Sequence, residues 1–483
     1  TTTAGTSNLR LGVNAGNSIA SGGDKNVVVG DEAGTAITTG DQNTFVGYAA
    51  GDATTTSSNN TGIGNNALGG NILGSYNVAI GKDSLEEMNP ATAVDMYNTA
   101  VGAAAGQKVT TGVQNTIIGA LAGDALTDSG PVVAVGYEAL STEDRDGGGT
   151  TAIGYQALKT QNAGATAYNT AVGWNAGLSV TTGVDNTLIG GLAGDALTDA
   201  DNNVAVGRSA LGSDTLGSRS TAVGRGALGA QNFTTATDSN NTAVGYTAGN
   251  SVTTGTNNSF LGAAAGLNVT TGINNTLIGS LAGDALTDAD QNTAVGFAAL
   301  GVDTLGSKST AIGRSALVSQ NFTTATDSFN TAIGHSAGLS ITTGVQNTLI
   351  GYQALTTDTL GSKSTAVGVG ALANQNFTTA TDSANTAVGF SAGGNVTTGI
   401  NNTLIGFEAG DKLTDADQNV AIGRRALYSS TLGGKSIAIG TNALHNSNHT
   451  TATDALNVAI GFQAGNFHTT GTLNVLIGAD AGL

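Results

Sequence analysis

The sequence predicts an all-β protein, a parallel β-solenoid of about 27 coils of 17–21 residues. Three observations predict this fold. A glycine recurs with a short period, the residue before it is always aliphatic, and one period is too short to hold a helix. A fixed short period indicates one structural unit stacked many times, each coil contacting its neighbours. We therefore expect residues 1–483 to form a single continuous repeat domain.

The recurring glycine occurs 27 times, from Gly12 to Gly478, mostly at intervals of 17 residues and five times at 21. We number each coil from this glycine, so that Gly245 is position 0, Val244 is −1 and Ala248 is +3. Position −1 is β-branched in all coils but two, and position +3 is usually alanine. Because β-branched residues favour extended backbone, each coil is expected to hold a short strand that ends in a corner at the glycine.

Both faces of this short strand are apolar, which bears on assembly. Neighbouring residues of a strand point to opposite faces. We assign positions −1, 0 and +3 to the core of the solenoid, namely Val244, Gly245, Ala248, Val295, Ile312 and Ile333. Position −2 then faces outward, yet it is apolar in nearly every coil, and a monomer would expose a long apolar ribbon.

An identical copy along a common axis is the simplest cover for such a ribbon. We therefore assign position −2 to an interface between chains. Its members include Ala243, Phe260, Leu277, Leu349 and Leu404.

Asparagine occupies position −4 in 21 of the 27 coils. Asparagine tolerates left-handed backbone, and stacked side-chain amides can hydrogen-bond along a ladder. We predict such a ladder at one corner of the solenoid, with Asn241, Asn258, Asn275 and Asn292 among its members.

The 21-residue coils carry an insertion of four residues, as in the phrase Gln320–Ser328. Insertions in repeat proteins map to loops on one face. We predict that the phenylalanine of each phrase lies in the core and that its threonine-rich remainder is an exposed loop.

Composition excludes several classes of function. Thirty-four acidic against sixteen basic residues give a net charge of −18, which disfavours binding to nucleic acid or to an anionic membrane. The chain has no cysteine, so disulfides and thiolate chemistry are absent. No apolar run approaches the ~18 residues of a membrane helix. We expect an extracellular protein without membrane insertion.

The sequence offers little catalytic chemistry, and we predict no catalytic, cofactor-binding or metal-binding residues. The acidic turn Asp284–Asp290 has similar copies that begin at Asp124, Asp195 and Asp411. Because calcium prefers carboxylate and carbonyl oxygens, these turns could bind structural calcium. Thr-Thr-Gly recurs at one phase, and regular threonine arrays on solenoid faces occur in ice-binding proteins, so ice binding is a further alternative. The aromatic residues at +1, such as Trp174, leave carbohydrate binding open.

The tandem motif Asn-Thr-Ala-Val-Gly-Tyr-x-Ala, as at 241–248, resembles the head repeats of trimeric autotransporter adhesins of the YadA type. Similar repeats occur in phage tail fibres and bacterial surface fibres. The resemblance covers essentially the whole chain. It implies a left-handed parallel β-roll, an intertwined or side-by-side homotrimer, and attachment to a host surface receptor or glycan.

We therefore expect a non-enzymatic fibre or adhesin shaft on a virion tail or a cell surface. The chain begins and ends within the repeat pattern, without visible caps, and we expect it to be a piece of a longer fibre. The alternative is a self-polymerising extracellular filament whose subunits stack end to end through their terminal coils. Negative-stain images would show rods of fixed length for the shaft and indefinite filaments for the polymer.

Overall fold

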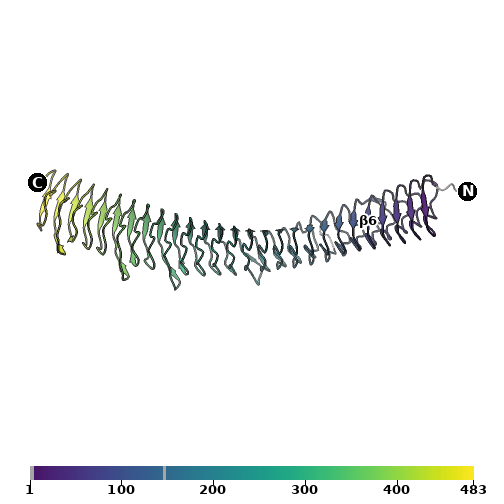
Figure 1. Cartoon of the computed structure of the whole chain (residues 1–483), viewed down its shortest axis with the longest axis horizontal. Helices are drawn as coiled ribbons and strands as arrows, with labels where there is room; N and C mark the ends of the chain where they lie inside the picture. Colours follow the sequence, from purple (N-terminus) through teal and green to yellow (C-terminus); the bar gives the residue numbers. More distant parts are fainter. Residues whose placement is uncertain (1–4, 145–147, 483) are drawn as a thin grey trace. The chain divides into compact units, whose positions relative to one another are not determined.

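A computed structural model describes residues 5–144 and 148–482. These residues form short strands and turns, and no helix occurs among them (Figure 1). Within each unit, the strand pairings of the described residues are parallel and join one coil to the next, so the prediction of an all-β parallel solenoid of about 27 coils is confirmed. The chain divides into two compact units, residues 1–241 and 242–483, which are described separately.

The first unit carries one main parallel sheet in which each coil contributes three residues, positions −3 to −1. Pairing is in register, so that Thr170 lies opposite Thr187 and Val172 opposite Ile189. The strands are β1 (Leu9–Leu11), β2 (Val27–Val29), β3 (Thr44–Val46), β4 (Thr61–Ile63), β6 (Val78–Ile80), β8 (Thr99–Val101), β9 (Thr116–Ile118), β10 (Val133–Val135), β11 (Thr151–Ile153), β12 (Thr170–Val172), β13 (Thr187–Ile189), β14 (Val204–Val206) and β16 (Thr221–Val223).

The second unit repeats this arrangement with the same register, as between Thr310 and Thr331. Its main sheet consists of β18 (Thr242–Val244), β19 (Ser259–Leu261), β20 (Thr276–Ile278), β21 (Thr293–Val295), β23 (Thr310–Ile312), β25 (Thr331–Ile333), β26 (Thr348–Ile350), β28 (Thr365–Val367), β30 (Thr386–Val388), β31 (Thr403–Ile405), β32 (Val420–Ile422), β34 (Ile437–Ile439), β36 (Val458–Ile460) and β37 (Val475–Ile477).

Five two-stranded sheets accompany the insertions. Each joins a glycine-containing pair in one coil to a pair in the following 21-residue coil. These pairs are β5 (Gly74–Ser75) with β7 (Val94–Asp95), β15 (Gly217–Ser218) with β17 (Thr237–Asp238), β22 (Gly306–Ser307) with β24 (Thr326–Asp327), β27 (Gly361–Ser362) with β29 (Thr381–Asp382), and β33 (Gly433–Gly434) with β35 (Thr453–Asp454).

The phenylalanines of three of these insertions are core residues, as predicted. Phe233 and Phe322 are 5 % exposed and Phe377 is 6 % exposed. The following threonines, such as Thr323 and Thr324, are exposed, in agreement with the predicted loop.

The structure reverses the predicted faces of the strand. Position −2 lies inside the coil, and Ala243, Phe260, Leu277, Leu349 and Leu404 are at most 1 % exposed within the single chain. Their assignment to an inter-chain interface is therefore wrong, because their own coil already encloses them.

Position −1 points outward instead. Ile312 is 36 % and Ile333 is 37 % exposed, and Val244 and Val295 are half-buried. Their assignment to the core is wrong. Gly245 lies at a partly exposed corner, whereas Ala248 is fully buried and its core assignment is confirmed.

The reason for the reversal is the narrow interior of a 17-residue coil. A β-carbon added at Gly266 would stand 2.4 Å from the ring of Phe260, and one at Gly194 would stand 2.7 Å from the side chain of Leu188. In these coils a glycine at +4 makes room for the large side chain at −2. Where −2 is alanine, position +4 is leucine in some coils, as with Ala311 and Leu317, and glycine in others, as with Ala243 and Gly249.

The predicted asparagine ladder is present. The Asn275 side chain donates from Nδ2 to the Ala289 carbonyl at 2.7 Å, and its Oδ1 accepts the backbone N–H of Asn292 at 3.0 Å. Asn258 Oδ1 accepts the backbone N–H of Asn275 at 2.9 Å. Asn241 is equally buried and donates to Gln231 Oε1 at 2.9 Å. The ladder satisfies backbone groups that would otherwise be buried without a partner.

Candidate functional site

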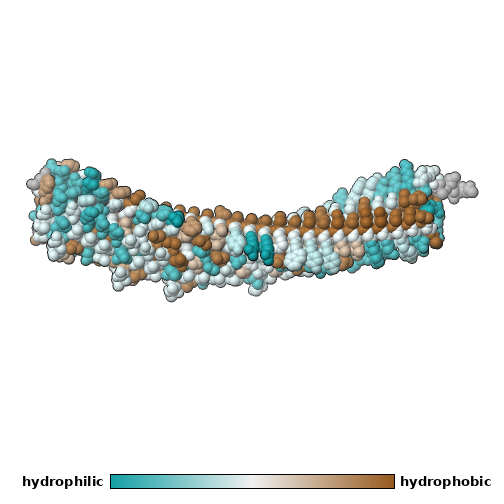
Figure 2. Space-filling model, viewed as in Figure 1, coloured by the Kyte–Doolittle hydropathy of each residue, from teal (hydrophilic) through white to brown (hydrophobic). Residues whose placement is uncertain are grey.

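A column of aliphatic side chains lies half-exposed on the outer face of the main sheet in each unit. We call this column, position −1, the aliphatic stripe. In the first unit, Figure 2 shows hydrophobic residues in a continuous row. Among the stripe residues, Ile63, Ile118 and Ile189 are 38–39 % exposed. In the second unit, Ile333, Ile350 and Ile405 are 37–38 % exposed.

The stripe has a partner column of threonines at position −3 on the same outward face. Thr187, Thr293 and Thr348 are half-buried members of this column. Adjacent strands are spaced by about 4.8 Å, so both columns repeat at that interval along each unit. The outer face is therefore a regular array with one aliphatic and one hydroxyl-bearing row.

A third column, position +1, lies just beyond the corner glycine and has a mixed composition. Its aromatic members stack on those of neighbouring coils. Phe390 and Phe407 have ring centroids 5.3 Å apart, and His335 and Tyr352 have centroids 5.5 Å apart. Charged residues also occur here, and the Arg314 guanidinium lies 5.9 Å from the centre of the Phe297 ring.

The insertions add ion pairs between coils. Lys308 pairs with Asp327 at 2.5 Å and Arg219 with Asp238 at 2.6 Å, in each case from a glycine-serine coil to the following insertion. Lys363 and Lys435 make the equivalent pairs with Asp382 and Asp454. Because these side chains are largely exposed, each pair contributes at most about 1 kcal/mol.

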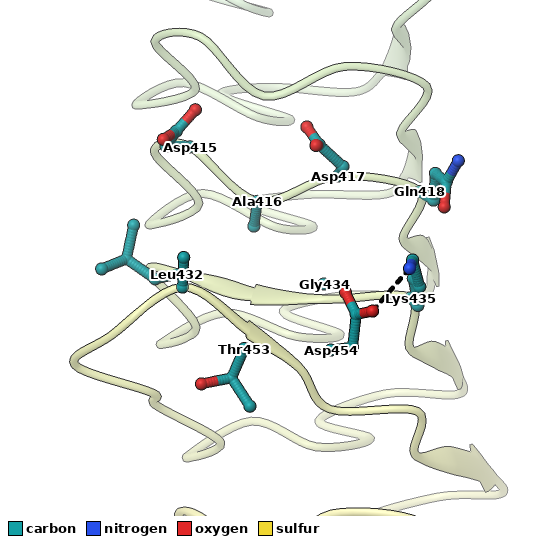
Figure 3. Close-up of a pocket in the computed structure, with 10 residues that line it drawn as sticks. Asp415, Ala416, Asp417, Gln418, Leu432, Gly434, Lys435, Thr453 and Asp454 are labelled. Atoms are coloured by element: carbon teal, nitrogen blue, oxygen red, sulfur yellow. Dashed lines mark hydrogen bonds and ion pairs between the residues drawn. The ribbon is translucent and has the colours of Figure 1, made fainter.

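An open depression of about 690 Å³ lies beside the last of these pairs. Lys435 and Asp454 reach toward each other across it, and Asp415 and Asp417 lie on the preceding coil (Figure 3). Both aspartates are already engaged, since Asp415 accepts from Thr398 Oγ1 at 2.6 Å and Asp417 from the Ile400 N–H at 2.8 Å. These hydrogen bonds join coils rather than gather oxygens at one point.

The acidic turns show a second feature. Burial raises the pKa of Asp124, Asp195, Asp284 and Asp411 above the ordinary value of 3.8. Within residues 5–144 and 148–482, no three histidine, cysteine or acidic side chains converge in a way that could hold a metal ion.

The four histidines are dispersed. His335 stacks on Tyr352 and His445 on Tyr428, whereas His449 is buried in the core, where desolvation lowers its pKa. His468 lies 2.8 Å from the Asn474 side chain at the last asparagine step. Each histidine therefore has a local contact in the fold.

The interior also contains buried polar pairs, which the sequence did not predict. Gln320 Nε2 donates to Asp303 Oδ2 at 2.6 Å, and the same pair recurs as Gln231 with Asp214 and Gln375 with Asp358. All six side chains are fully buried. Each of the three pairs joins an insertion coil to the coil before it, so the pairs hold the insertion in position.

Across the part of the chain that the structure describes, no helix is long and apolar enough to cross a membrane. A scan against protein-family models and a search of curated proteins found no match to this chain. The function is therefore inferred from the fold and its surfaces.

Proposed function

We propose that this chain is a non-enzymatic structural fibre protein whose aliphatic stripe packs against identical chains in a homotrimer. The assembled fibre supports attachment to a host or another surface outside the cell, as a phage tail fibre or a bacterial adhesin does. The observation that carries the proposal is the stripe, because a half-exposed aliphatic residue recurs at position −1 in coil after coil. Monomeric soluble proteins rarely expose contiguous apolar patches larger than a few hundred Å².

Identical chains fit this surface best. A sister chain presents the same column with the same rise per coil, so contacts made at one coil can repeat at every other. β-Branched side chains lose little conformational freedom when they are buried. The number three comes from the resemblance of the repeat to adhesin head repeats, as does the role in attachment.

Light scattering coupled to size exclusion tests the assembly. We expect a particle of three times the 47.1 kDa chain mass, resistant to SDS or heat. Replacing Ile312, Ile333 and Ile350 by lysine should yield monomers, since burying unpaired charges costs several kcal/mol. The control carries lysine at the exposed loop residues Thr235, Thr324 and Thr379, which changes the net charge equally, and should remain trimeric. A monomeric wild type would contradict the proposal.

A self-polymerising filament would also cover the stripe if chains associate side by side. Negative-stain images of the same sample separate the two assemblies. Rods of one length support the fibre shaft, and filaments of indefinite length support the polymer.

A second candidate function, ice binding, is favoured by the threonine column. The hydroxyls of Thr187, Thr293 and Thr348 have no hydrogen-bond partner within the described residues, and they stand beside the aliphatic stripe at a regular spacing. In contrast, the first threonine of most Thr-Thr-Gly sites is engaged, since Thr270 Oγ1 donates to the Thr287 carbonyl at 3.3 Å. Thermal hysteresis at micromolar protein concentration, lost when column threonines are replaced by lysine, would support ice binding, and its absence would exclude this function.

A further inference from the structure

The +1 column of the first unit contains a short ladder of aromatic rings. Tyr137 stacks on Tyr155 with centroids 5.6 Å apart, and Tyr155 stacks on Trp174 with centroids 6.5 Å apart and planes 16° apart. Trp174 is 55 % exposed although one face of its indole lies against Tyr155. The exposed area is therefore on the edge and on the face toward the next coil.

The next coil places a glycine where the ladder would continue. Leu192 donates its N–H to the Trp174 carbonyl at 2.9 Å, and Ser209 donates to the Gly191 carbonyl at 3.0 Å, so the coils follow in the order Trp174, Gly191, Arg208. A β-carbon at Gly191 would have one neighbour within 4 Å, the Trp174 carbonyl oxygen at 3.9 Å. Two coil spacings of about 4.8 Å separate Trp174 from Arg208, which leaves room for one stacked ring.

In the second unit, the same column has arginine directly after phenylalanine on adjacent coils. The Arg424 guanidinium lies 6.0 Å from the centre of the Phe407 ring on the adjacent coil, and Arg314 lies 5.9 Å from that of Phe297. These contacts are within the range of a cation–π interaction. At Gly191 the chain contributes no side chain to the corresponding layer between the coils of Trp174 and Arg208.

The charge beside this open layer is positive in a chain of net charge −18. Arg208 and Arg225 occupy position +1 of consecutive coils, joined by the Gly226 N–H to the Arg208 carbonyl at 3.0 Å, and both side chains are exposed. Two neighbouring guanidinium groups repel each other and attract an anion. A planar guanidinium also binds a carboxylate through two parallel hydrogen bonds.

We propose that Trp174, Gly191 and Arg208 form a binding slot for one acidic hexopyranose unit, such as a uronate residue of an anionic polysaccharide. The C–H face of the sugar ring stacks on the indole, Gly191 provides the floor, and the sugar carboxylate binds Arg208. This assignment adds a ligand class to the proposed fibre function and depends on residues of one chain.

The slot stays accessible in the assembly proposed above. Charged residues are depleted from the buried centre of protein interfaces and lie at the rim. The +1 column contains arginine, histidine and lysine, whereas the aliphatic stripe contains none. The composition thus places the stripe at the centre of the interface and the slot at its edge.

Trp174 is the single tryptophan of the chain, so its fluorescence reports on the slot directly. We expect a saturable change of Trp174 emission when a short oligogalacturonate is added, with calorimetry as a second readout. Arg208→Gln should weaken binding about fivefold or more and remove most of its dependence on salt. A neutral maltooligosaccharide should bind at least about fivefold more weakly than the acidic probe.

Gly191→Tyr fills the open layer with the chain's own ring and should abolish binding. The matched control is Ala263→Tyr, which adds tyrosine at position +1 of a coil in the second unit, where the alanine is exposed, and should leave binding unchanged.

Three results would overturn the assignment. These are no saturable response in the wild type, binding by Gly191→Tyr equal to the wild type, or equal affinity for the neutral probe. Light scattering on the same samples reports the assembly state separately, so a failure of the slot and a failure of the trimer are distinguishable. If Gly191→Tyr does not fold, Arg208→Gln takes its place, and binding by Arg208→Gln equal to that of the wild type overturns the assignment.

Discussion

The corner glycine of each coil is constrained both by its backbone angle and by the coil stacked on it. Gly190 has a φ of +134°, and an added β-carbon would stand 2.7 Å from the carbonyl of Gly207. Residues other than glycine rarely adopt such a φ. The carbonyl of Gly207 cannot move aside without disturbing the next coil. The glycine period of the sequence therefore reflects a geometric requirement repeated in each coil.

Gly190→Ala should destabilise its region by about 2–4 kcal/mol, because strain and overlap add. The adjacent Gly191→Ala is the control, since its β-carbon meets open space, and its effect should stay within about 1 kcal/mol of zero. Hydrogen exchange of the flanking coils measures both changes. Equal protection in the two variants would contradict the role of the corner glycine.

The acidic turns predict a pH effect at the residue scale. Burial raises the folded-state pKa of Asp195 above its ordinary value of 3.8, partly offset by a hydrogen bond from its own backbone N–H. The folded chain therefore holds this proton more tightly than the unfolded chain. The bound proton stabilises the folded chain fully below pH 3.8, and this stabilisation is lost as pH rises through the folded-state pKa of Asp195.

Asp195→Asn should accordingly raise the melting temperature at pH 7 and leave it unchanged near pH 3. The gain corresponds to about a few tenths of a kcal/mol, because the carboxyl is only half-buried and is screened by solvent. Asp185→Asn, at an exposed position, serves as the control for the loss of one negative charge. A gain for Asp195→Asn that persists at pH 3 would refute the burial explanation.

At the scale of the element, buried polar pairs join the insertion coils to their neighbours. Asp303 accepts the N–H groups of Gly306 at 3.1 Å and Phe322 at 3.0 Å on one oxygen and Gln320 Nε2 on the other. Gln320 Oε1 in turn accepts from Asn330 at 2.9 Å. Each polar atom has a defined donor or acceptor role, so the network is sensitive to exchange of carboxylate and amide.

Asp303→Asn should cost about 1–3 kcal/mol, because the introduced amide nitrogen faces the Gln320 amide nitrogen and two donors cannot bond. Adding Gln320→Glu restores an acceptor opposite the introduced amide nitrogen and keeps one for Asn330. The double variant should therefore recover most of the lost stability. A thermal melt of the two single variants and the double variant measures the coupling, and additive losses would contradict the assigned roles.

Of these two hydrogen-bonded features, the sequence predicted the asparagine ladder but not the buried polar pairs. The asparagine ladder could be predicted because one polar residue recurs at one phase, as at Asn258 and Asn275. The buried pair of Asp303 and Gln320 could not, because such residues are usually exposed. The available signal was their separation by one coil at the same phase in three insertions.

The direction of the strand faces could not be predicted from alternation alone. A three-residue strand that is apolar at −2 and −1 fits either orientation equally well. The informative feature is that the large Phe260 occurs together with the small Gly266. The two pack against each other inside the coil, so position −2 must face inward there. The corrected faces exchange the roles of Ala243 and Val244, while the need for a cover over one apolar column remains.

At the scale of the whole molecule, the fold is a stack of coils whose stability sums over nearest neighbours. Within each unit the interior is filled by positions −2 and +3, and the asparagine ladder satisfies buried backbone groups. The aliphatic stripe has no such partner within the described chain. In the proposed trimer, the slot at Trp174 lies at the rim of this surface.

The central claim is that position −1 meets sister chains while position −2 is enclosed by its own coil. The chain has no cysteine, so the single variants Ile333→Cys and Ala332→Cys compare adjacent residues directly. Treatment of the assembled protein with a short bis-maleimide should cross-link the chains of Ile333→Cys and leave Ala332→Cys unreacted. Cross-linking of Ala332→Cys, or rapid labelling of Ile333→Cys by a bulky thiol reagent on a particle of monomeric mass, would contradict the account.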